Sequence, residues 1–355
     1  MSSNKSIGIG VLGCGRIGVM HAELIAQRIE GAHLAGVYDV ISESAQKVAT
    51  KFGCQHFSDP ESLMSSADVN AIAICTSTDT HVEVLIMASK YKKPVFCEKP
   101  ISLSLTETDR ALKAISDSKT PLMLGFNRRY DPTHRSVRDS VANGVVGDVH
   151  IARITSRDPA PPPVAYAKVS GGIFIDMTIH DFDMARYVVG SEIVSVYATG
   201  AVRIVPEFAE IGDLDTVAIM LQHANGAITM IDNSRQAVYG YDQRVEVFGS
   251  KGMTASDNPL MTSTISRNEN GTQLAKMPYF FLDRYIPSYI AEWNEFMGVA
   301  TGKIQPVVTG ADGRASLVAG LAAWRAGEGR CRVCGCGCVV LCVCVCVCVC
   351  VCGCV

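Results

Sequence analysis

The 355-residue sequence lacks any block of basic residues, and its net charge at pH 7 is −3. A nucleic acid is therefore not an expected partner, because binding to phosphates requires clustered lysine and arginine. The N-terminus lacks the apolar stretch of a signal peptide, since residues 1–6 are largely polar and lead directly into a strand-like segment. These absences argue against a nucleic-acid-binding protein and against a secreted one.

Cysteine is scarce in most of the chain: Cys14, Cys54, Cys75 and Cys97 are the four that precede residue 331. Scattered thiols in apolar segments are typical of a reducing compartment, so we expect a cytoplasmic protein. The other eleven of the fifteen cysteines lie in residues 331–355, where Val and Cys alternate.

A GTGTGT dinucleotide repeat encodes this alternation of Val and Cys. We therefore interpret residues 331–355 as a low-complexity tail, a translated repeat or frame error, and not as native folded structure. A cysteine metal site and an uncharged membrane anchor over residues 335–355 are the alternatives.

What the sequence does contain is an acidic run around one histidine, between Gly171 and Met184. Asp176 and His180 are four residues apart, so a helix over about residues 173–189 would place them on one face. A carboxylate beside an imidazole can move a proton near neutral pH. On these residues alone an acid–base site, a metal site and a buried structural pair all remain open.

A glycine-rich motif directly follows the first strand-like segment, residues 7–12, and precedes a helical pattern that continues to about residue 29. Strand, G-x-G-x-x-G turn and helix in this order indicate a dinucleotide-binding turn, in which the helix N-terminus binds phosphate. The motif residues are Gly13, Gly15, Arg16, Ile17 and Gly18.

Asp39 ends the second strand-like segment, residues 33–38. A carboxylate at this distance from the glycines accepts hydrogen bonds from the adenosine ribose and repels a 2′-phosphate. Val40 and Ile41 follow it, with no arginine to bind that phosphate, so NAD is expected in preference to NADP. The alternative is that Asp39 merely ends a strand.

Strand-like and helical segments continue to alternate up to residue 126, which predicts a parallel, doubly wound sheet. Ligands bind outside the carboxyl ends of such strands, and polar residues follow two of these ends. Pro100 restricts Lys99, which we expect to stabilise a developing alkoxide, although a solvated lysine paired with Glu98 is the alternative. The cofactor-site candidates at these ends are Thr76, Ser77, His81, Glu98 and Lys99.

After about residue 128 the pattern changes to a succession of strand-like runs, which predicts a mostly antiparallel open sheet with helices on one face. The fold class expected is therefore α/β, with a Rossmann domain over residues 1–127. A substrate-binding and oligomerisation domain is expected over residues 128–330, followed by the Val/Cys tail over 331–355.

Three motifs together resemble those of the Gfo/Idh/MocA oxidoreductases: the glycine-rich turn, the run from Cys97 to Pro100, and the run from Asp176 to Asp181. Longer strings around Asp158, His180 and Tyr241 are similar to the inositol dehydrogenases of that family, and the resemblance covers about residues 6–327. No metal is expected, because one histidine with carboxylates makes a poor zinc site. The resemblance implies NAD as cofactor and a homotetramer formed through the open sheet. It also implies catalysis by Lys99, Asp176 and His180, and polyol binding by Arg129, Asp183, Tyr239 and Tyr285.

The implied reaction is oxidation of a cyclic polyol, myo-inositol to 2-keto-myo-inositol (scyllo-inosose), with scyllo-inositol or another sugar as the alternative substrate. Two rival classes are a metal-dependent dehydrogenase with Asp176 and His180 as ligands, and a non-catalytic sugar sensor that binds NAD without turnover.

Overall fold

The computed structural model describes residues 6–329 and 333–334, and these form two compact units. The first unit extends to Asn127 and also includes Ser288–Arg314, and the second contains Arg128–Pro287 and the described residues from Ala315 on. The prediction for the Val/Cys tail falls outside the described residues except at Val333–Cys334, which form the short strand β15.

The first unit is built on a parallel six-stranded sheet in the order β3-β2-β1-β4-β5-β6. The order places consecutive strands outward from β1 in both directions, which is the doubly wound arrangement predicted. The strands are β1 (Ile7–Leu12), β2 (Ala32–Tyr38), β3 (Gln55–His56), β4 (Ala71–Ile74), β5 (Val95–Glu98) and β6 (Leu122–Gly125).

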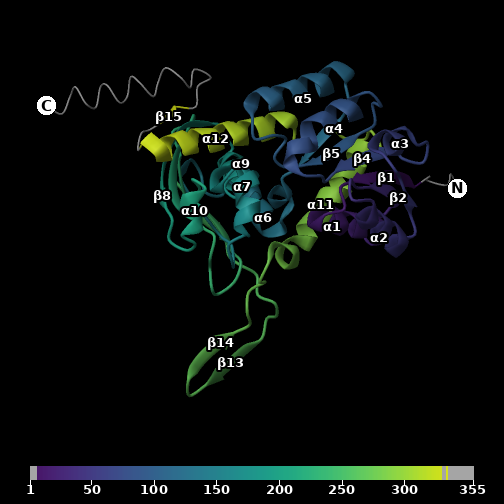
Figure 1. Ribbon diagram of the computed structural model, residues 1–355. Helices are drawn as coiled ribbons and strands as arrows, with labels where there is room; N and C mark the ends of the chain where they lie inside the picture. The colour runs from purple at the N-terminus through teal and green to yellow at the C-terminus, as the bar shows by residue number, and fades with distance from the viewer. Residues whose placement is uncertain (1–5, 330–332, 335–355) are drawn as a thin grey trace. The chain divides into compact units, whose positions relative to one another are not determined.

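Helices cover both faces of this sheet, with α1 and α2 on one side and α4 and α5 on the other (Figure 1). All four residues of β4 and all four of β5 are buried, as expected for central strands between two helical layers. The helices are α1 (Arg16–Gln27), α2 (Ser42–Phe52), α3 (Pro60–Ser65), α4 (His81–Ser89) and α5 (Leu105–Ser118), with a 3₁₀ turn η1 (Thr78–Thr80) before α4.

Residues 288–314 belong to the first unit, whereas the sequence analysis assigned all of 128–330 to the second domain. The physical reason is aromatic packing from helix α11 (Phe281–Ala300). Trp293 and Phe296 lie 4.9 and 5.9 Å, centroid to centroid, from the ring of Phe96 in β5. The backbone N–H of Leu124 also donates to the carbonyl oxygen of Val308 at 3.0 Å.

The second unit contains a seven-stranded sheet in the order β12-β11-β7-β10-β9-β8-β15. Neighbouring strands are antiparallel except β7 and β10, which are parallel, so the predicted mostly antiparallel sheet is confirmed. The strands are β7 (Val149–Arg157), β8 (Ile193–Ala201), β9 (Thr216–His223), β10 (Ile228–Ser234), β11 (Asp242–Gly249) and β12 (Gly252–Ser256).

One face of this sheet packs against helices and the other is open. Residues of β7, β9, β10 and β11 alternate between buried and exposed, and the buried ones form one core with helical residues such as Phe182 and Ala323. The helices and turns of this unit are η2 (Asn127–Tyr130), α6 (Pro132–Ala142), α7 (Val164–Ser170), α8 (Ile173–Asp176), α9 (Ile179–Val189), α10 (Glu207–Glu210) and most of α12 (Gly310–Gly329).

A hairpin of β13 (Ile265–Asn268) and β14 (Gly271–Leu274) extends from the second unit as an arm (Figure 1), and every residue of its strands is exposed. The sequence analysis did not predict it. In the described part of the chain, no helix has both the length and the apolar character needed to cross a membrane.

Candidate active site

The glycine-rich turn joins β1 to α1 as the motif predicted. Gly13 has φ +94°, a conformation that favours glycine, and a Cβ there would lie 2.5 Å from the carbonyl oxygen of Cys75. A Cβ on Gly18 would lie 1.9 Å from the carbonyl oxygen of Gly13, so this glycine lets the helix pack against the turn. Gly15 precedes α1 and is exposed, with no atom within 4 Å of an added Cβ.

This geometry fits the pyrophosphate of a dinucleotide. Gly15 and Arg16 are exposed at the N-terminus of α1, Ile17 is half-buried, and the first N–H groups of a helix bind anions. The open space at Gly15 is the space in which a phosphate could approach the backbone closely.

Asp39 lies at the end of β2, next to the same turn. Its carboxylate accepts hydrogen bonds from the backbone N–H of Cys14 at 2.6 Å and of Ile41 at 2.8 Å. These bonds fix the carboxylate beside the glycine-rich turn, while Val40 is 86% exposed and offers no cation to a 2′-phosphate. The arrangement fits an NAD ribose.

The candidates after β4 hold one another in place. The Thr80 hydroxyl contacts the Thr76 hydroxyl at 2.7 Å and the carbonyl oxygen of Ser77 at 2.8 Å. His81 is 1% exposed, and its ring nitrogens lie 3.0 Å from the carbonyl oxygen of Thr76 and 2.8 Å from that of Pro100. His81 therefore connects two strand-end loops and is buried, whereas Ser77 is exposed.

Glu98 is the last residue of β5 and is 8% exposed. Its carboxylate contacts the ring of His21 at 2.7 Å. Lys99, directly after it, is half-buried and follows the same strand end as predicted. Lys99 lies in the first unit, whereas Asp176 and His180 lie in the second.

The prediction of one continuous helix over residues 173–189 was wrong at its centre. Helix α8 ends at Asp176 and α9 begins at Ile179. The carbonyl oxygen of Ile173 accepts from the backbone N–H groups of both Met177 and Thr178, and the Thr178 side chain contacts Asn233 Oδ1 at 2.5 Å. This side-chain bond to a distant strand interrupts the regular helical ladder between the two candidate catalytic residues.

Asp176 is half-buried and accepts two hydrogen bonds from other elements. Tyr166 Oη donates to Oδ1 at 2.8 Å, and Arg235 Nη1 donates to Oδ2 at 3.0 Å. Arg235 is 1% exposed, lies 5.7 Å from the Phe208 ring, and reaches Asp213 Oδ2 at 3.6 Å. Arg235 was not predicted from the sequence, where it is a lone arginine after a strand-like segment.

Asp181 is completely buried and serves as the centre of a polar cluster. Its Oδ1 accepts from Arg128 Nη1 at 2.7 Å and from the Ser156 hydroxyl at 2.6 Å, and its Oδ2 accepts from Asn233 Nδ2 at 2.8 Å. Burial raises the pKa of Asp181, while the Arg128 charge opposes that shift. The geometry makes Asp181 a structural anchor of the second unit.

Three of the four predicted polyol-binding residues are buried or partnered within the second unit. Asp183 and Arg129 form a two-bond ion pair, with Nε to Oδ2 at 2.8 Å and Nη2 to Oδ1 at 2.6 Å. Tyr285 is 1% exposed, its hydroxyl lies 3.4 Å from His134 Nε2, and burial raises its pKa to about 12.

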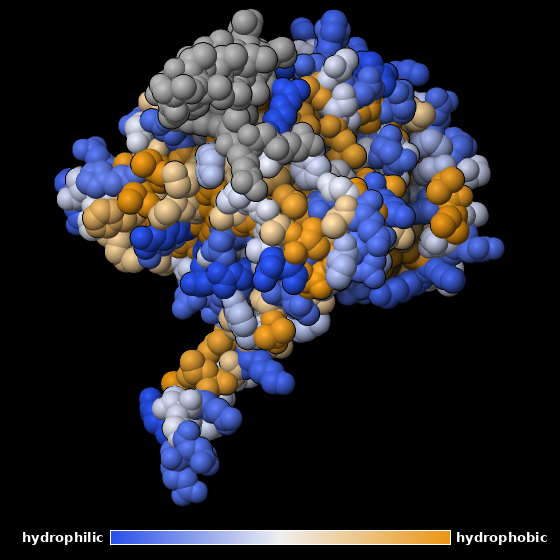
Figure 2. All heavy atoms as spheres, turned by 60° about the vertical axis from the view of Figure 1, so that its left-hand side comes forward, coloured by the Kyte–Doolittle hydropathy of each residue, from blue (hydrophilic) through white to orange (hydrophobic). Residues whose placement is uncertain are grey.

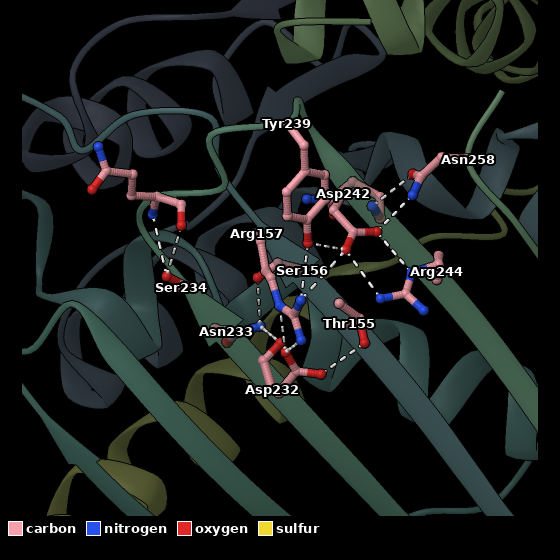
Figure 3. Close-up of polar contacts among 12 residues, drawn as sticks. Thr155, Ser156, Arg157, Asp232, Asn233, Ser234, Tyr239, Asp242, Arg244 and Asn258 are labelled. Atoms are coloured by element: carbon pink, nitrogen blue, oxygen red, sulfur yellow. Dashed lines mark hydrogen bonds and ion pairs between the residues drawn. The ribbon is translucent and has the colours of Figure 1, made fainter. Parts of the chain in front are cut away.

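Tyr239, the fourth, belongs to a different polar network, on the open face of the sheet (Figure 3). Its hydroxyl donates to Asp242 Oδ2 at 2.7 Å and accepts from Arg157 Nη1 at 2.9 Å. Arg157 Nε donates in turn to Asp232 Oδ1 at 2.7 Å, and Asp242 also accepts from Arg244 at 2.8 Å. The charged partners fix the orientation of a ring that is itself 53% exposed.

Asp158 is a further candidate that the sequence analysis quoted within a longer string but did not select. Burial raises its pKa to about 6, with the charges of Asp176 and Asp181 adding to the shift and those of Arg235 and Arg128 opposing it. A carboxyl group can accept a hydrogen bond from a substrate hydroxyl and, when it is protonated, can donate one. The Asp-Pro step before the proline run was its only sequence signal.

A metal centre has no ready set of ligands here. Among residues 6–329 and 333–334, no three side chains of His, Cys, Asp or Glu are grouped so that they could hold a metal ion.

Two family models match the chain: an oxidoreductase family with an NAD-binding Rossmann fold over residues 7–126, and a GFO/IDH/MocA C-terminal domain over residues 134–255. The myo-inositol 2-dehydrogenase of Thermotoga maritima is 46% identical over 316 residues, which cover 89% of this chain and 94% of that protein. The inositol 2-dehydrogenase of Rhizobium meliloti is 42% identical over 321 residues, covering 90% and 97%.

Among solved structures, the scyllo-inositol dehydrogenase of Lactobacillus casei with bound NAD(H) and scyllo-inositol superimposes with a TM-score of 0.87 at 29% identity, covering 93% of this chain and 99% of that one. The first family model spans the glycine-rich turn and the parallel sheet, and the second spans most of the seven-stranded sheet. The chain therefore belongs to the Gfo/Idh/MocA family of NAD-binding oxidoreductases.

Proposed function

We propose that this protein oxidises myo-inositol to 2-keto-myo-inositol (scyllo-inosose), with NAD as the acceptor of the hydride. The observation that carries the proposal is 46% identity, over 89% of the chain, to a protein named myo-inositol 2-dehydrogenase. The fixed Asp39 carboxylate and the open space at Gly15 support the choice of cofactor.

Residues of the first unit hold the cofactor in this proposal. The N–H groups at the start of α1 bind the pyrophosphate, Asp39 accepts hydrogen bonds from the adenosine ribose, and Thr76 and Ser77 line the neighbouring strand end. When bound, NAD supplies the redox chemistry by accepting the hydride from the substrate carbon.

The proton chemistry falls to three residues. His180 removes the proton from the substrate hydroxyl as general base. Asp176, held in place by Arg235 and Tyr166, orients His180 and stabilises the imidazolium that His180 becomes. Lys99 stabilises the negative charge that develops on the substrate oxygen.

Binding of the polyol falls to side chains that can exchange hydrogen bonds with ring hydroxyls. Arg129, Asp183, Tyr239 and Tyr285 remain the proposed contacts, and we add Asp158 to them. Asp158 is half-buried, and burial raises its pKa to about 6 although the charges of Arg235 and Arg128 oppose that shift.

The replacement His180→Ala tests the assignment. We expect kcat to fall by about 10²- to 10⁴-fold, because a general base is removed. Binding of NADH, followed by its fluorescence, should persist, because the cofactor contacts proposed here all lie in the first unit. His33→Ala, which removes an exposed histidine of β2, is the control. Retention of most of kcat by His180→Ala would contradict the proposed role.

A panel of myo-inositol, scyllo-inositol and related sugars, assayed by NADH formation, distinguishes the remaining substrates. Scyllo-inositol is the second candidate, because the structure of an enzyme with that substrate covers 93% of this chain. Turnover insensitive to a chelator argues against a metal-dependent dehydrogenase. NADH binding without turnover of any polyol would instead favour a sugar sensor.

We further propose that the protein assembles as a homotetramer through the open face of the second sheet. This face exposes large apolar side chains and carries a groove of about 310 Å³, and the stem of the arm adds a further hydrophobic surface (Figure 2). Exposed apolar patches of this kind mark subunit contacts. The residues are Tyr197, Met220, Ile228, Phe248 and Met253 on the sheet, and Leu260, Met261, Leu274 and Tyr279 on the arm.

Light scattering after size-exclusion chromatography measures the assembly. Met220→Lys with Phe248→Lys should give smaller species, since two charges would be buried in the contact.

Four free thiols, Cys14, Cys54, Cys75 and Cys97, support the proposed cytoplasmic location. In domain terms, we propose that cofactor binding belongs to the first unit and substrate binding to the second.

A further inference from the structure

Lys99 lies between two residues that are each held by a buried histidine. On its N-terminal side, the carboxylate of Glu98 contacts His21 Nε2 at 2.7 Å. On its C-terminal side, the carbonyl oxygen of Pro100 contacts His81 Nδ1 at 2.8 Å. Both histidines are almost completely buried, with exposures of 0% and 1%.

The hydrogen-bond partners of His21 determine where its proton lies. Trp293 Nε1 lies 2.8 Å from His21 Nδ1, and an indole N–H can only donate. Nδ1 must therefore accept, so the ring proton is on Nε2 and is donated to the Glu98 carboxylate. The hydrogen bonds therefore run in one direction, from the Trp293 N–H to His21 and from the His21 N–H to the Glu98 carboxylate.

Packing restricts the orientation of the His21 ring and of the Glu98 carboxylate. The His21 ring makes edge contacts with Phe96, Tyr289 and Trp293 at centroid distances of 5.2, 5.5 and 5.6 Å. The Glu98 carboxyl lies over Gly125, where an added Cβ would come within 3.1 Å of it. A Cβ at position 125 would press on the Glu98 carboxyl and the Phe96 ring, so glycine leaves them the room they occupy.

The second histidine acts on the opposite side of Lys99. His81 Nε2 lies 3.0 Å from the carbonyl oxygen of Thr76, so the ring bridges the loops that follow β4 and β5. Desolvation lowers the pKa of His81, although the two carbonyl groups and the charge of Glu98 oppose this shift. Both carbonyl oxygens can only accept, so a ring with one N–H donates to one of them and packs against the other. In either tautomer His81 lies between the proposed cofactor loop and the Lys99 loop.

We propose that His21, aligned by Trp293, and His81 are positioning residues that fix Lys99 from both sides and couple its placement to the cofactor-binding helix α1 and the β4 loop. The inference rests on the proposed function in assigning Lys99 a role in turnover. It goes beyond that function in assigning roles to two histidines that touch neither substrate nor reacting atoms.

A double-mutant cycle between His21→Leu and Lys99→Met tests the proposal with the full-length protein, NAD and myo-inositol. His21→Leu should lower kcat by about 10- to 100-fold, because small displacements of a catalytic group have effects of this size. In the Lys99→Met background the same replacement should have no further effect, because the group that it positions is gone. The dissociation constant of NADH should change little, so the loss should appear in kcat. The cycle with His81→Leu is read in the same way.

Two further variants separate positioning from folding. His21→Gln keeps an N–H that can reach Glu98, and we expect it to retain most of kcat even if His21→Leu does not fold. His223 in the second unit is the matched control: it is 1% exposed and contacts Ser191 and Thr229 at 2.9 and 2.8 Å. His223→Leu should change kcat by the same factor in the parent protein and in the Lys99→Met variant.

The results divide cleanly between the two proposals. If Lys99→Met alone leaves kcat unchanged, the role of Lys99 in the proposed function is wrong. Suppose instead that Lys99→Met lowers kcat, but each histidine replacement lowers it by the same factor in the parent protein and in the Lys99→Met variant. The histidines then act through the fold, and the positioning inference is wrong. The same conclusion follows if His21→Gln is as impaired as His21→Leu.

Discussion

The glycine-rich turn of the first unit and the acidic run of the second are both short motifs, yet they relate differently to the structure. The turn is made largely from neighbouring residues: the Gly13 carbonyl oxygen lies where a Cβ on Gly18 would be, and α1 begins directly after Gly15. In the acidic run, each carboxylate finds its partner on a distant element. The comparison teaches that backbone geometry can be inferred locally, whereas the role of a charge depends on what lies opposite.

The partners of the acidic run show this clearly. Asp176 pairs with Arg235, Asp181 with Arg128, and Asp183 with Arg129. Each of the three aspartates therefore has an arginine, but Asp181 and Asp183 are almost fully buried while Asp176 is partly accessible. Burial leaves Asp176 as the most accessible carboxylate of the three, which agrees with its proposed role, and makes Asp181 part of the fold.

Among the replacements that test this comparison, Asp181→Asn should have the largest effect on stability. The replacement leaves the Arg128 charge buried without its counter-ion, which should lower the free energy of unfolding by about 3–5 kcal/mol. Chemical denaturation measures the loss. Arg153→Gln, which breaks the surface pair with Glu246, is the control and should cost less than about 1 kcal/mol. Equal losses in the two variants would show that Asp181 is not the anchor described.

The matched replacements Gly18→Ala and Gly15→Ala test the glycine-rich turn, which is the other motif compared. At Gly18 an added Cβ collides with the Gly13 carbonyl, so we expect a loss of stability of about 1–3 kcal/mol. At Gly15 nothing lies within 4 Å, so the melting temperature should be unchanged while NADH binding weakens. Thermal melts and NADH titrations measure both. Unweakened binding in Gly15→Ala would argue against a phosphate at this position.

The choice between NAD and NADP should respond to Asp39→Ser combined with Val40→Arg. Loss of a charge-assisted hydrogen bond to the ribose should weaken NAD by about 1.5–3 kcal/mol, and the new arginine should improve NADP. The ratio of kcat/KM for the two cofactors is the measurement. An unchanged ratio would mean that Asp39 does not select the cofactor. Asp79→Ser, at an exposed position in η1, is a control.

The smallest effect concerns a buried carboxyl behind Glu98. Burial, and then the Glu98 charge, raise the pKa of Glu292 well above 4.5. The folded protein therefore keeps a proton that the unfolded chain loses, so this group's contribution to stability is greatest below pH 4.5 and declines as pH rises. Glu292→Gln should remove that decline and be more stable than the parent at pH 8, with the difference shrinking toward pH 5. Melting curves at the two pH values provide the check, and a constant difference would contradict the assignment.

Much of the first unit was predictable. The strand-like segments predicted over 33–38 and 7–12 appear as Ala32–Tyr38 and Ile7–Leu12, because buried parallel strands are short apolar runs with turn residues at their ends. The inclusion of 288–314 was not predictable, since it depends on aromatic contacts between Phe96 and residues about 200 positions later.

In the second unit, the alternation of buried and exposed residues predicted the strands but not their neighbours. The parallel pairing of β7 with β10 joins segments that are separated by β8 and β9 in the chain, and hydropathy carries no record of it. The break between α8 and α9 escaped prediction for the same reason, because it depends on the bond between Thr178 and Asn233.

The glycine-rich turn and the strand ends that carry Asp39 and Lys99 could be predicted from the residues alone, and so could the proposal of Lys99, Asp176 and His180 for acid–base chemistry. These follow from local backbone geometry and from residue type. It took the folded chain to show that Asp181 is an anchor, that Asp183 pairs with Arg129, and that Arg235 holds Asp176. The same holds for His21 and His81, which contact Glu98 and Pro100 on either side of Lys99 in the sequence. A charge or an imidazole acquires its role from the partner that folding brings to it and from the water that folding removes.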